Sequence, residues 1–448
     1  MRYITNTVEQ QQEMLKEIGV SSFEELLDTI PAAVRFKGDL KVPGPLSELE
    51  LEEHLIDLAG QNAGFAFLKP LIGAGAYRHY IPRAVTALLG REEFYTAYTP
   101  YQPERSQGIL QAMFELQTYL SRLTGMEVII PSVYDGASAV AEAALMTLRL
   151  TRKNKIIISS TLHPHYRAVI ETYAAPHETD IIELPYREGL VDSAGLEEAL
   201  ADDTASVIVQ SPNFFGGIEK IAELTELTHA RGALFIQVVA EGISLGLLKP
   251  PGEMGVDIVA GEAQSLGMAL SFGGPYNGYL AARKKFLRQL PGRIVGETLD
   301  RDGKRAFVMT SRAREQDIRR EKATSCICSN HGLNIIASDI YLSLMGTEGL
   351  HQIALLNTRA AHYLEERLVE GGGFEKVFDY PFFNEFLLRS RKPILEIREL
   401  LLKNGFIPPL SAGVFLGDGQ LENAALFAVT EIFSRQDLDR VVRLVSGQ

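Results

Sequence analysis

The sequence predicts an α/β fold in which helices cover both faces of a mostly parallel sheet. Short segments rich in Ile and Val alternate with amphipathic segments, and strands that are apolar along their whole length are typical of a sheet buried on both faces. The expected strands lie at residues 156–158, 181–184, 207–209, 234–236 and 258–259. Because one hydrophobic core seldom serves more than about 300 residues, a chain of 448 residues is expected to form more than one domain.

Helices are expected ahead of these strands and between them. Apolar residues three or four positions apart predict a long amphipathic helix from about residue 106 to Gly125. A second helix is expected to open just after Gly136, and others at 164–174 and 220–231. This alternation indicates a large α/β domain.

The two ends of the chain show different patterns. Near the start, Ser22 with Glu25 and Ser47 with Glu50 have the spacing of a capping box, so helices are expected within the first ~60 residues. Toward the end we expect two helices, a break at the glycines 371–373 and then an α+β segment. The predicted organisation is a helical segment with a Tyr-rich loop over 1–105, a large α/β domain over 106–315 and a small α+β domain over 316–448.

Composition argues against several classes of protein. Lys plus Arg total 44 and Asp plus Glu total 57, a net charge of −13, which is poorly suited to neutralising nucleic-acid phosphates. Cys326 and Cys328 cannot form a zinc site by themselves, and no metal site is predicted. The longest uncharged run, 263–282, contains Pro275 and four glycines, so no membrane span is expected. The first residues lack a signal-peptide pattern, and the expected location is the cytoplasm.

Two glycine-containing segments invite comparison with phosphate-binding loops. The segment 73–77 resembles part of a dinucleotide loop, but the flanking Pro70 and Pro82 leave no strand–turn–helix, so a tightly turned or flexible loop is expected. Gly136 and Ser138 open a predicted helix whose free N–H groups could cradle a phosphate. An ordinary helix start, capped by Asp135 and Ser138, is the alternative, and the motif alone favours it.

Tyrosines are concentrated around the loop 94–105. Tyr95, Tyr98 and Tyr101 lie in it, and with Tyr77 and Tyr80 they make five of the chain's 16 tyrosines within 25 residues. Loops of this kind often mark contact surfaces. The rings could equally pin the loop to the core, and their density alone leaves both interpretations open.

Two further features lie near expected element ends. His163 follows a predicted strand at the edge of the sheet where ligands of open α/β folds bind, although a turn residue or a packed ring is the alternative. The basic stretch 312–322 could receive anionic groups. Its interspersed acids, Glu315, Asp317 and Glu321, favour solvated ion pairs instead.

Several longer segments are more specific. The most extensive is Glu-Phe-Tyr-Thr-Ala-Tyr-Thr-Pro-Tyr-Gln-Pro-Glu at 93–104, and others lie at 77–82, 106–111, 123–126, 134–139, 213–216, 246–253, 271–276 and 319–325. On these segments the chain resembles the glycine decarboxylase (P-protein) family of the glycine cleavage system, and more narrowly the alpha subunit, or subunit 1, of its two-chain bacterial form. It departs from the family pattern at Asp317, Cys326 and Pro131-Ser132.

The resemblance implies a pyridoxal-phosphate-dependent transferase-like fold of type I, with a mostly parallel seven-stranded sheet, a helical N-terminal segment and a smaller C-terminal α+β domain. Pyridoxal chemistry needs a Schiff-base lysine and usually an Asp beneath the pyridine nitrogen. At the plausible place for the Asp stands Gln237, and no lysine occurs between Lys249 and Lys284, where the Schiff-base residue is expected. The chain is therefore expected to hold no covalent cofactor, with Gly136 and Ser138 as a vestigial phosphate loop.

The resemblance further implies the non-lysine half of a heteromeric glycine dehydrogenase (aminomethyl-transferring). The beta subunit is expected to carry pyridoxal phosphate, and the complex to decarboxylate glycine and pass the aminomethyl group to the lipoyl arm of H-protein. A self-sufficient pyridoxal-phosphate-dependent aminotransferase or lyase and a purely structural or regulatory partner are the alternatives. The residues of this chain expected at the wall of the composite active site are Tyr95, Tyr98, Thr99, Tyr101, Gln102, His163, Arg319, Lys322 and Thr324.

Overall fold

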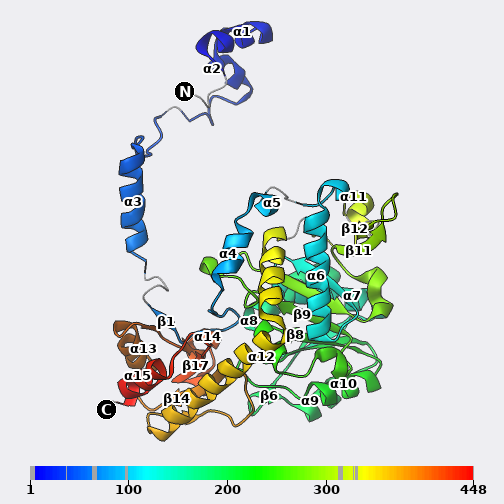
Figure 1. Ribbon diagram of the computed structural model, residues 1–448, viewed down its shortest axis with the longest axis vertical. Helices are drawn as coiled ribbons and strands as arrows, with labels where there is room; N and C mark the ends of the chain where they lie inside the picture. The colour runs from blue at the N-terminus through cyan, green and yellow to red at the C-terminus, as the bar shows by residue number, and fades with distance from the viewer. Residues whose placement is uncertain are drawn as a thin grey trace. The chain divides into compact units, whose positions relative to one another are not determined.

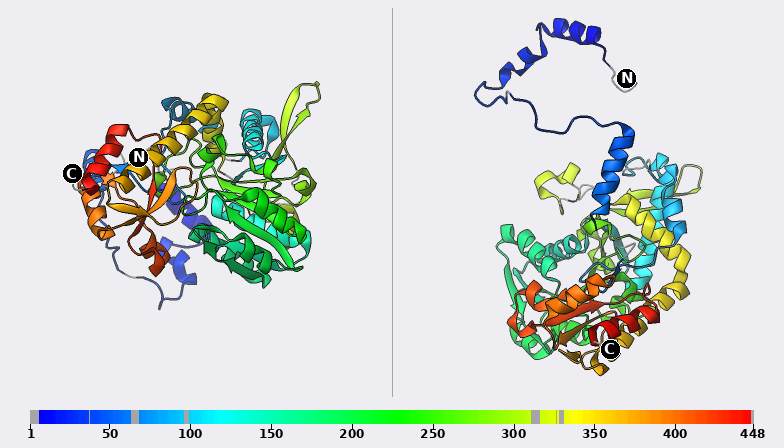
Figure 2. Two further views of the ribbon diagram at one scale, coloured as in Figure 1. Left: turned by 90° about the horizontal axis from the view of Figure 1, so that it is seen from below. Right: turned by 90° about the vertical axis from the view of Figure 1, so that its left-hand side faces the viewer.

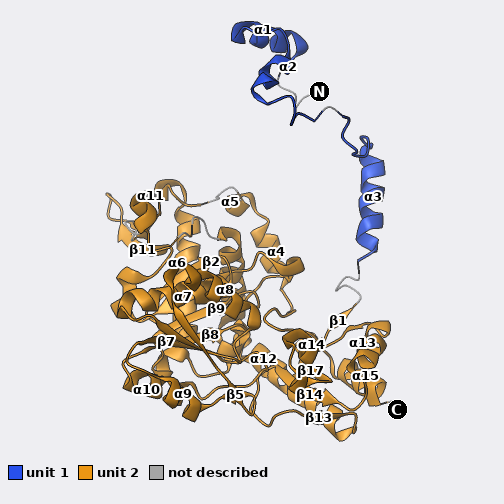
Figure 3. Cartoon of the chain, turned by 180° about the vertical axis from the view of Figure 1, so that it is seen from behind, with its two compact units in different colours: residues 1–63 blue, residues 64–448 orange. Residues whose placement is uncertain are grey.

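The computed structural model describes residues 6–36, 38–62, 68–95, 99–310, 316–325, 327 and 331–446. The chain divides into two compact units, residues 1–63 and residues 64–448 (Figure 3). The three-part division at 105 and 315 stays a prediction. No helix within the described residues is both long and apolar enough to cross a bilayer.

The first unit is helical. It contains α1 (Val8–Ile18), α2 (Phe23–Leu26) with the 3-10 turn η1 (Leu27–Thr29), and α3 (Glu48–Gly60) (Figure 1). Thr7 and Ser47 form capping boxes with Gln10 and Glu50, while the Ser22 side chain accepts a hydrogen bond from the N–H of Glu25. The helix starts predicted at Ser22 and Ser47 are thus confirmed.

The second unit is built on a seven-stranded sheet. Only one strand of this sheet, β10, runs antiparallel to its neighbours, and the other adjacent pairs are parallel. Ile236 lies opposite Ile208 on one side and Ile258 on the other. The spatial order is β2 (Val128–Val133), β10 (Gly278–Ala282), β9 (Ile258–Glu262), β8 (Leu234–Val239), β7 (Thr204–Gln210), β3 (Lys155–Ser159) and β4 (Asp180–Leu184).

Helices cover both faces of this sheet because its strands carry apolar side chains on both. Val207 and Val209 pack into one core with α6 (Gln107–Thr124), α10 (Ile221–Ala230) and the first part of α12 (Gly332–Glu370). Ile208, between them, packs into a second core with α7 (Gly136–Thr151) and α8 (Pro164–Ala174). Figure 2 shows these layers from two further directions.

A smaller sheet stands at the other end of α12. Its order is β13 (Phe374–Lys376), β14 (Glu385–Ser390), β17 (Ala424–Ala428) and β16 (Leu410–Ser411). The last part of α12 packs with α13 (Ile394–Lys403) and α15 (Arg435–Ser446) to form a third core. The short paired strands are β1 (Lys69–Pro70) with β15 (Phe406–Ile407), β5 (Tyr186–Arg187) with β6 (Leu190–Val191), and β11 (Ile294–Leu299) with β12 (Arg305–Thr310).

The connections contain short helices. Those that matter for the site are α5 (Glu92–Tyr95), η2 (Pro103–Arg105), η4 (Gly242–Gly246), α11 (Gln316–Arg319) and η9 (Arg320–Lys322). The others are α4 (Arg83–Leu89), η3 (Ala175–His177), α9 (Ser193–Ala199), η5 (Pro251–Met254), η6 (Ser271–Gly273), η7 (Lys284–Gln289), α14 (Ala412–Leu416) and η10 (Gly419–Leu421).

The predicted fold class is confirmed, as are its five strands and the helices at 106–125, after Gly136, at 164–174 and at 220–231. Within the seven-stranded sheet, residue patterns missed two strands, β2 and β10. Pro131 and Ser132 interrupt the apolar pattern of β2, and β10 is made largely of Gly and Ala, which have low strand preference.

Candidate functional site

The carboxyl edge of the large sheet gathers the first set of polar residues. Gly136 and Ser138 form the first turn of α7, His163 precedes α8 directly, and Glu262 ends β9. Parallel strands bring such ends together at the edge where open α/β sheets bind ligands. Three of the residues predicted from sequence, Gly136, Ser138 and His163, therefore share this edge.

The Glu262 carboxylate occupies the start of α7. Its Oε2 accepts a hydrogen bond of 2.9 Å from the Gly136 N–H, and its Oε1 accepts bonds of 3.1 Å from Gln264 N–H and 3.0 Å from Asn277 N–H. The Ser138 N–H donates to Asp135 Oδ1 at 2.7 Å. Burial raises the pKa of Glu262 to about 7. A side-chain carboxylate thus stands at a helix N-terminus, where a bound anion is stabilised by N–H groups and the helix dipole.

His163 is held on several sides by the chain itself. Its Nε2 lies 2.9 Å from the Ala74 carbonyl oxygen, to which it donates, and its Nδ1 accepts from the His165 N–H at 3.1 Å. The ring stacks on Tyr166 with centroids 5.0 Å apart. Burial lowers the pKa of His163 to about 4, so the imidazole is neutral at physiological pH.

The segment 73–77 closes over this edge. Gly75 has φ +93°, and a methyl group there would lie 2.9 Å from His163 Cδ2, so the turn needs glycine. The Tyr77 N–H donates to Gln264 Oε1 at 2.9 Å, and Gln264 Nε2 donates back to Tyr77 O at 3.0 Å. The Tyr77 hydroxyl donates to Glu385 Oε2 at 2.6 Å. Of the two forms expected for this segment, a tightly turned or a flexible loop, the structure shows the tightly turned one.

A buried charged triad anchors the same segment two residues further on. His79 Nδ1 lies 2.8 Å from Glu431 Oε2, and His79 Nε2 lies 3.1 Å from Glu241 Oε2. Burial opposes the charge on His79, but the two carboxylates together raise its pKa to about 10. Glu241 lies just before η4 and Glu431 just after β17, so the triad links the large-sheet and small-sheet regions of the second unit.

This edge does not fit pyridoxal phosphate. The Glu262 carboxylate already takes the Gly136 N–H that would receive the phosphate group. Gln237, at the end of β8, is neutral and cannot hold a proton on the pyridine nitrogen. In the loop after β9, Gln264 is bonded to Tyr77, and no lysine occurs between residues 250 and 283. The edge therefore offers no lysine amine in the loop after β9, and the Gly136 N–H is already bonded to Glu262.

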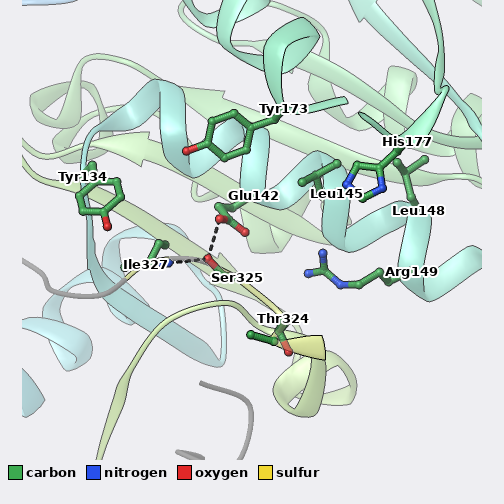
Figure 4. A pocket seen from close by; sticks show the side chains of 11 residues that line it. Tyr134, Glu142, Leu145, Leu148, Arg149, Tyr173, His177, Thr324, Ser325 and Ile327 are labelled. Atoms are coloured by element: carbon green, nitrogen blue, oxygen red, sulfur yellow. Dashed lines mark hydrogen bonds between the residues drawn. The ribbon is translucent and has the colours of Figure 1, made fainter. Parts of the chain in front are cut away.

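A second polar site lies on the middle of α7. Glu142 and Arg149 line a pocket of about 510 Å³ bounded by α8, residues 323–325 and Ile327 (Figure 4). Ser325 Oγ donates to Glu142 Oε1 at 2.6 Å. Thr324 lines this pocket, while Arg319 and Lys322 are exposed on α11 and η9. Arg312, Arg314 and both cysteines lie outside the described residues.

The predicted aromatic loop lies near the start of β11. Tyr95 is exposed at the end of α5, and Gln102 is exposed just before η2. The Tyr101 hydroxyl accepts a 3.2 Å hydrogen bond from Arg293 Nη2, and the guanidinium lies 5.0 Å from the ring centroid. The Thr99 carbonyl accepts from the Tyr101 N–H at 2.7 Å, whereas Tyr98 lies outside the described residues. Within the described chain no group of three or more His, Cys, Asp or Glu could hold a metal ion.

This fold, with a mostly parallel seven-stranded sheet and a smaller α+β region, defines the type I class of pyridoxal-phosphate-dependent enzymes. A glutamate decarboxylase from Lactobacillus brevis shares the fold at 13% identity, with a TM-score of 0.69 over 95% of this chain and 96% of that one. The model of the glycine cleavage system P-protein family matches residues 1–445, and the chain belongs to this family.

The sequences of the relatives match this chain over nearly the whole length of both. A probable glycine dehydrogenase (decarboxylating) subunit 1 from Desulfitobacterium hafniense is 49% identical over 442 residues, covering 99% of this chain and 98% of the relative. A protein of the same description from Moorella thermoacetica is 49% identical over 447 residues, covering 100% and 99%. A crystal structure of glycine decarboxylase (P-protein) in inhibitor-bound form has 41% identity and a TM-score of 0.89, with both chains fully covered.

Sequence reasoning missed several residues that shape these sites. Glu262 lies in the segment 261–267, where a Schiff-base lysine is expected and is missing. A single Glu at the end of a strand does not indicate which group its carboxylate will bond. His79, Glu241 and Glu431 are far apart in sequence, so only the fold brings them together. Glu142 and Arg149 are seven positions apart on one helix, a spacing that places them on one face.

Proposed function

We propose that this chain is the non-lysine, alpha subunit of a heteromeric glycine decarboxylase. In this proposal it works in the cytoplasm with a beta subunit that carries pyridoxal phosphate and the Schiff-base lysine. The complex decarboxylates glycine and transfers the aminomethyl group to the lipoyl arm of H-protein. The cofactor, when bound to the partner, supplies the electron sink for decarboxylation.

The observation that carries this proposal is a mismatch between family and site. The chain matches relatives described as subunit 1 over their full length, yet its own sheet edge is closed by Glu262 and the segment 73–77. A self-sufficient enzyme of this class needs a lysine where this chain has none. Subunit 1 of a two-chain enzyme satisfies both facts.

This chain's part in the reaction is to wall a site completed by the partner. The loop around Tyr95, Thr99, Tyr101 and Gln102 presents aromatic and uncharged polar groups, and Tyr101 is held by Arg293. Such a wall can exclude water and orient the substrate carboxylate through hydroxyl and amide groups. His163, Arg319, Lys322 and Thr324 belong to the same proposal.

Co-expression with a beta subunit from the same source tests the function directly. The complex is expected to catalyse exchange of CO2 with the carboxyl group of glycine in the presence of lipoylated H-protein, and neither chain alone is expected to do so. Full activity of the beta subunit alone would favour a structural or regulatory role for this chain. An aldimine absorbance band in this chain purified alone would favour a self-sufficient enzyme.

The substitution Tyr95→Phe tests the proposed wall. If the Tyr95 hydroxyl hydrogen-bonds the substrate only in the transition state, the exchange rate of the complex falls about tenfold, since about 1.4 kcal/mol is a factor of ten. Assembly and thermal stability stay close to wild type because Tyr95 is exposed. Tyr80→Phe, at another exposed tyrosine outside the loop, is the matched control. Unchanged exchange in Tyr95→Phe would remove this hydroxyl from the mechanism.

A further inference from the structure

The pocket on the middle of α7 is a built cavity outside the closed sheet edge. Its volume is about 510 Å³, within the range of small-molecule sites. α7 supplies one wall, Tyr173 and His177 lie on the α8 side, and residues 323–325 with Ile327 form the other side. In Figure 4 the Arg149 side chain extends into the pocket, and Glu142 and Ser325 face it from across the opening.

Two oppositely charged side chains in this pocket, Glu142 and Arg149, have buried atoms without a hydrogen-bond partner among the described residues. Glu142 is 4% exposed, and its Oε2 is buried with no hydrogen-bond partner, although Oε1 accepts from Ser325. Arg149 Nε and Nη2 are likewise buried with no partner. The described ion pairs within 4.0 Å do not include one between Glu142 and Arg149. Burial raises the pKa of the Glu142 carboxyl, and the Ser325 hydrogen bond and the charge of Arg149 offset this only in part.

Leaving a buried polar atom unpartnered costs about 1–3 kcal/mol, and more when the group is charged. Such groups in a native structure are expected to have a ligand or ordered water. Seven residues on a helix span about 10 Å, so the two side chains leave room for a short ligand between their charged ends. A ligand that pairs with both Glu142 and Arg149 must carry an ammonium and a carboxylate.

The apolar residues that line the rest of the pocket indicate what kind of side chain the ligand carries. Leu145 and Leu148 lie on the same face of α7 between and beside the two charges, and Ile327 approaches from the opposite segment. These side chains offer an apolar surface that neither charged group of a ligand would occupy. Burying a methyl-rich side chain there is favourable by about 0.8 kcal/mol for each CH2 group.

We propose that this pocket binds a free α-amino acid with an aliphatic side chain. The ligand ammonium donates to Glu142 Oε2, the ligand carboxylate accepts from Arg149, and the aliphatic side chain packs on Leu145 and Leu148. No bond is made or broken in this binding. Binding ties α7 to residues 323–325, which include Thr324 and Ser325.

Calorimetric titration of the full chain, without partner or cofactor, tests this site independently of the proposed function. L-Leucine is expected to bind with a Kd in the millimolar range or tighter. Glycine, which lacks the side chain, and 4-methylpentanoate and 3-methylbutylamine, which each lack one charge, are expected to bind at least tenfold more weakly. Absence of leucine binding at 20 mM, or equal binding of the single-charge analogues, would overturn the proposal.

Substitutions locate the binding. Glu142→Gln and Arg149→Gln are each expected to weaken leucine binding at least tenfold, because each removes one of the two charges. Glu171→Gln on α8 and Arg122→Gln on α6 make the same charge changes at exposed positions and should leave the Kd within twofold. If leucine binds equally well to all four variants, the pocket is not the site. If either pocket variant fails to fold, the analogue series on the wild-type chain still decides.

Discussion

Two regions of α7 differ in whether the chain itself supplies hydrogen-bond partners for the buried charged groups there. At the helix start, the Glu262 carboxylate accepts three backbone hydrogen bonds supplied by the same chain. Further along the helix, Glu142 keeps one oxygen, and Arg149 two nitrogens, without hydrogen-bond partners in the part of the chain that is described. One helix thus carries an N-terminal N–H already bonded to a carboxylate of the chain and, further along, charged atoms that the chain leaves without a hydrogen bond.

The largest expected effect comes from removing His79, the central residue of the buried triad that anchors the segment covering the sheet edge. His79→Ala removes the cation between Glu241 and Glu431 and leaves two buried carboxylates facing each other. Removing one partner of a buried ion pair is expected to lower the free energy of unfolding by about 4 kcal/mol. Urea denaturation of the full chain measures this. His54→Ala, at an exposed histidine on α3, is the matched control and should change it by less than about 0.5 kcal/mol. A similarly small loss for His79→Ala would show that the triad does not anchor the segment.

Glu262→Ala tests whether the carboxylate replaces an anion. Three buried N–H groups lose their acceptor, and the expected loss is about 3 kcal/mol. Inorganic phosphate should partly restore the stability of this variant, because the free N–H groups at the start of α7 then bind it. Thermal melts in phosphate and in chloride at equal ionic strength make the comparison. Equal stabilisation of the wild-type chain and the variant by phosphate would contradict the interpretation that the Glu262 carboxylate replaces an anion.

Replacing Glu by Gln at positions 262 and 142 compares the bonded carboxylate at the helix start with the carboxylate that faces the pocket. Glu262→Gln places an NH2 group against a backbone N–H and should cost about 2 kcal/mol. Glu142→Gln retains an oxygen for Ser325 and otherwise faces the cavity, so it should change stability by less than about 0.5 kcal/mol. Equal losses at both positions would mean that the pocket is not open in solution.

A smaller effect is expected from pH. The folded pKa of His79, about 10, lies above its ordinary value of 6.5, so its contribution is complete below about pH 6.5 and is lost as the pH rises through about 10. The stability of the wild-type chain should fall by about 1.3 kcal/mol between pH 7.5 and 8.5 relative to that of His79→Ala. Parallel curves for the two proteins would contradict a charged His79.

Local patterns predicted most of the fold. Apolar runs located β3, β4, β7, β8 and β9, and capping residues located the starts of α2 and α3. They missed β2 and β10, whose Pro, Ser, Gly and Ala residues are placed in the sheet by their neighbours rather than by their own preference.

The sites were less predictable because they depend on contacts between distant residues. The missing lysine and Gln237 could be read directly, and so could the helix start at Gly136. The carboxylate that fills that helix start comes from position 262, and the triad joins positions 79, 241 and 431. The spacing of Glu142 and Arg149 is visible in sequence, but their lack of partners appears only when the surrounding side chains are in place.

The most direct test of the closed sheet edge is to find where the cofactor binds in the assembled enzyme. The complex of this chain with its beta subunit is loaded with pyridoxal phosphate, reduced with borohydride, digested and mapped by mass spectrometry. We expect one pyridoxyl label for each pair of chains, on a lysine of the partner, and none on this chain. A stoichiometric label on any lysine of this chain would contradict the account.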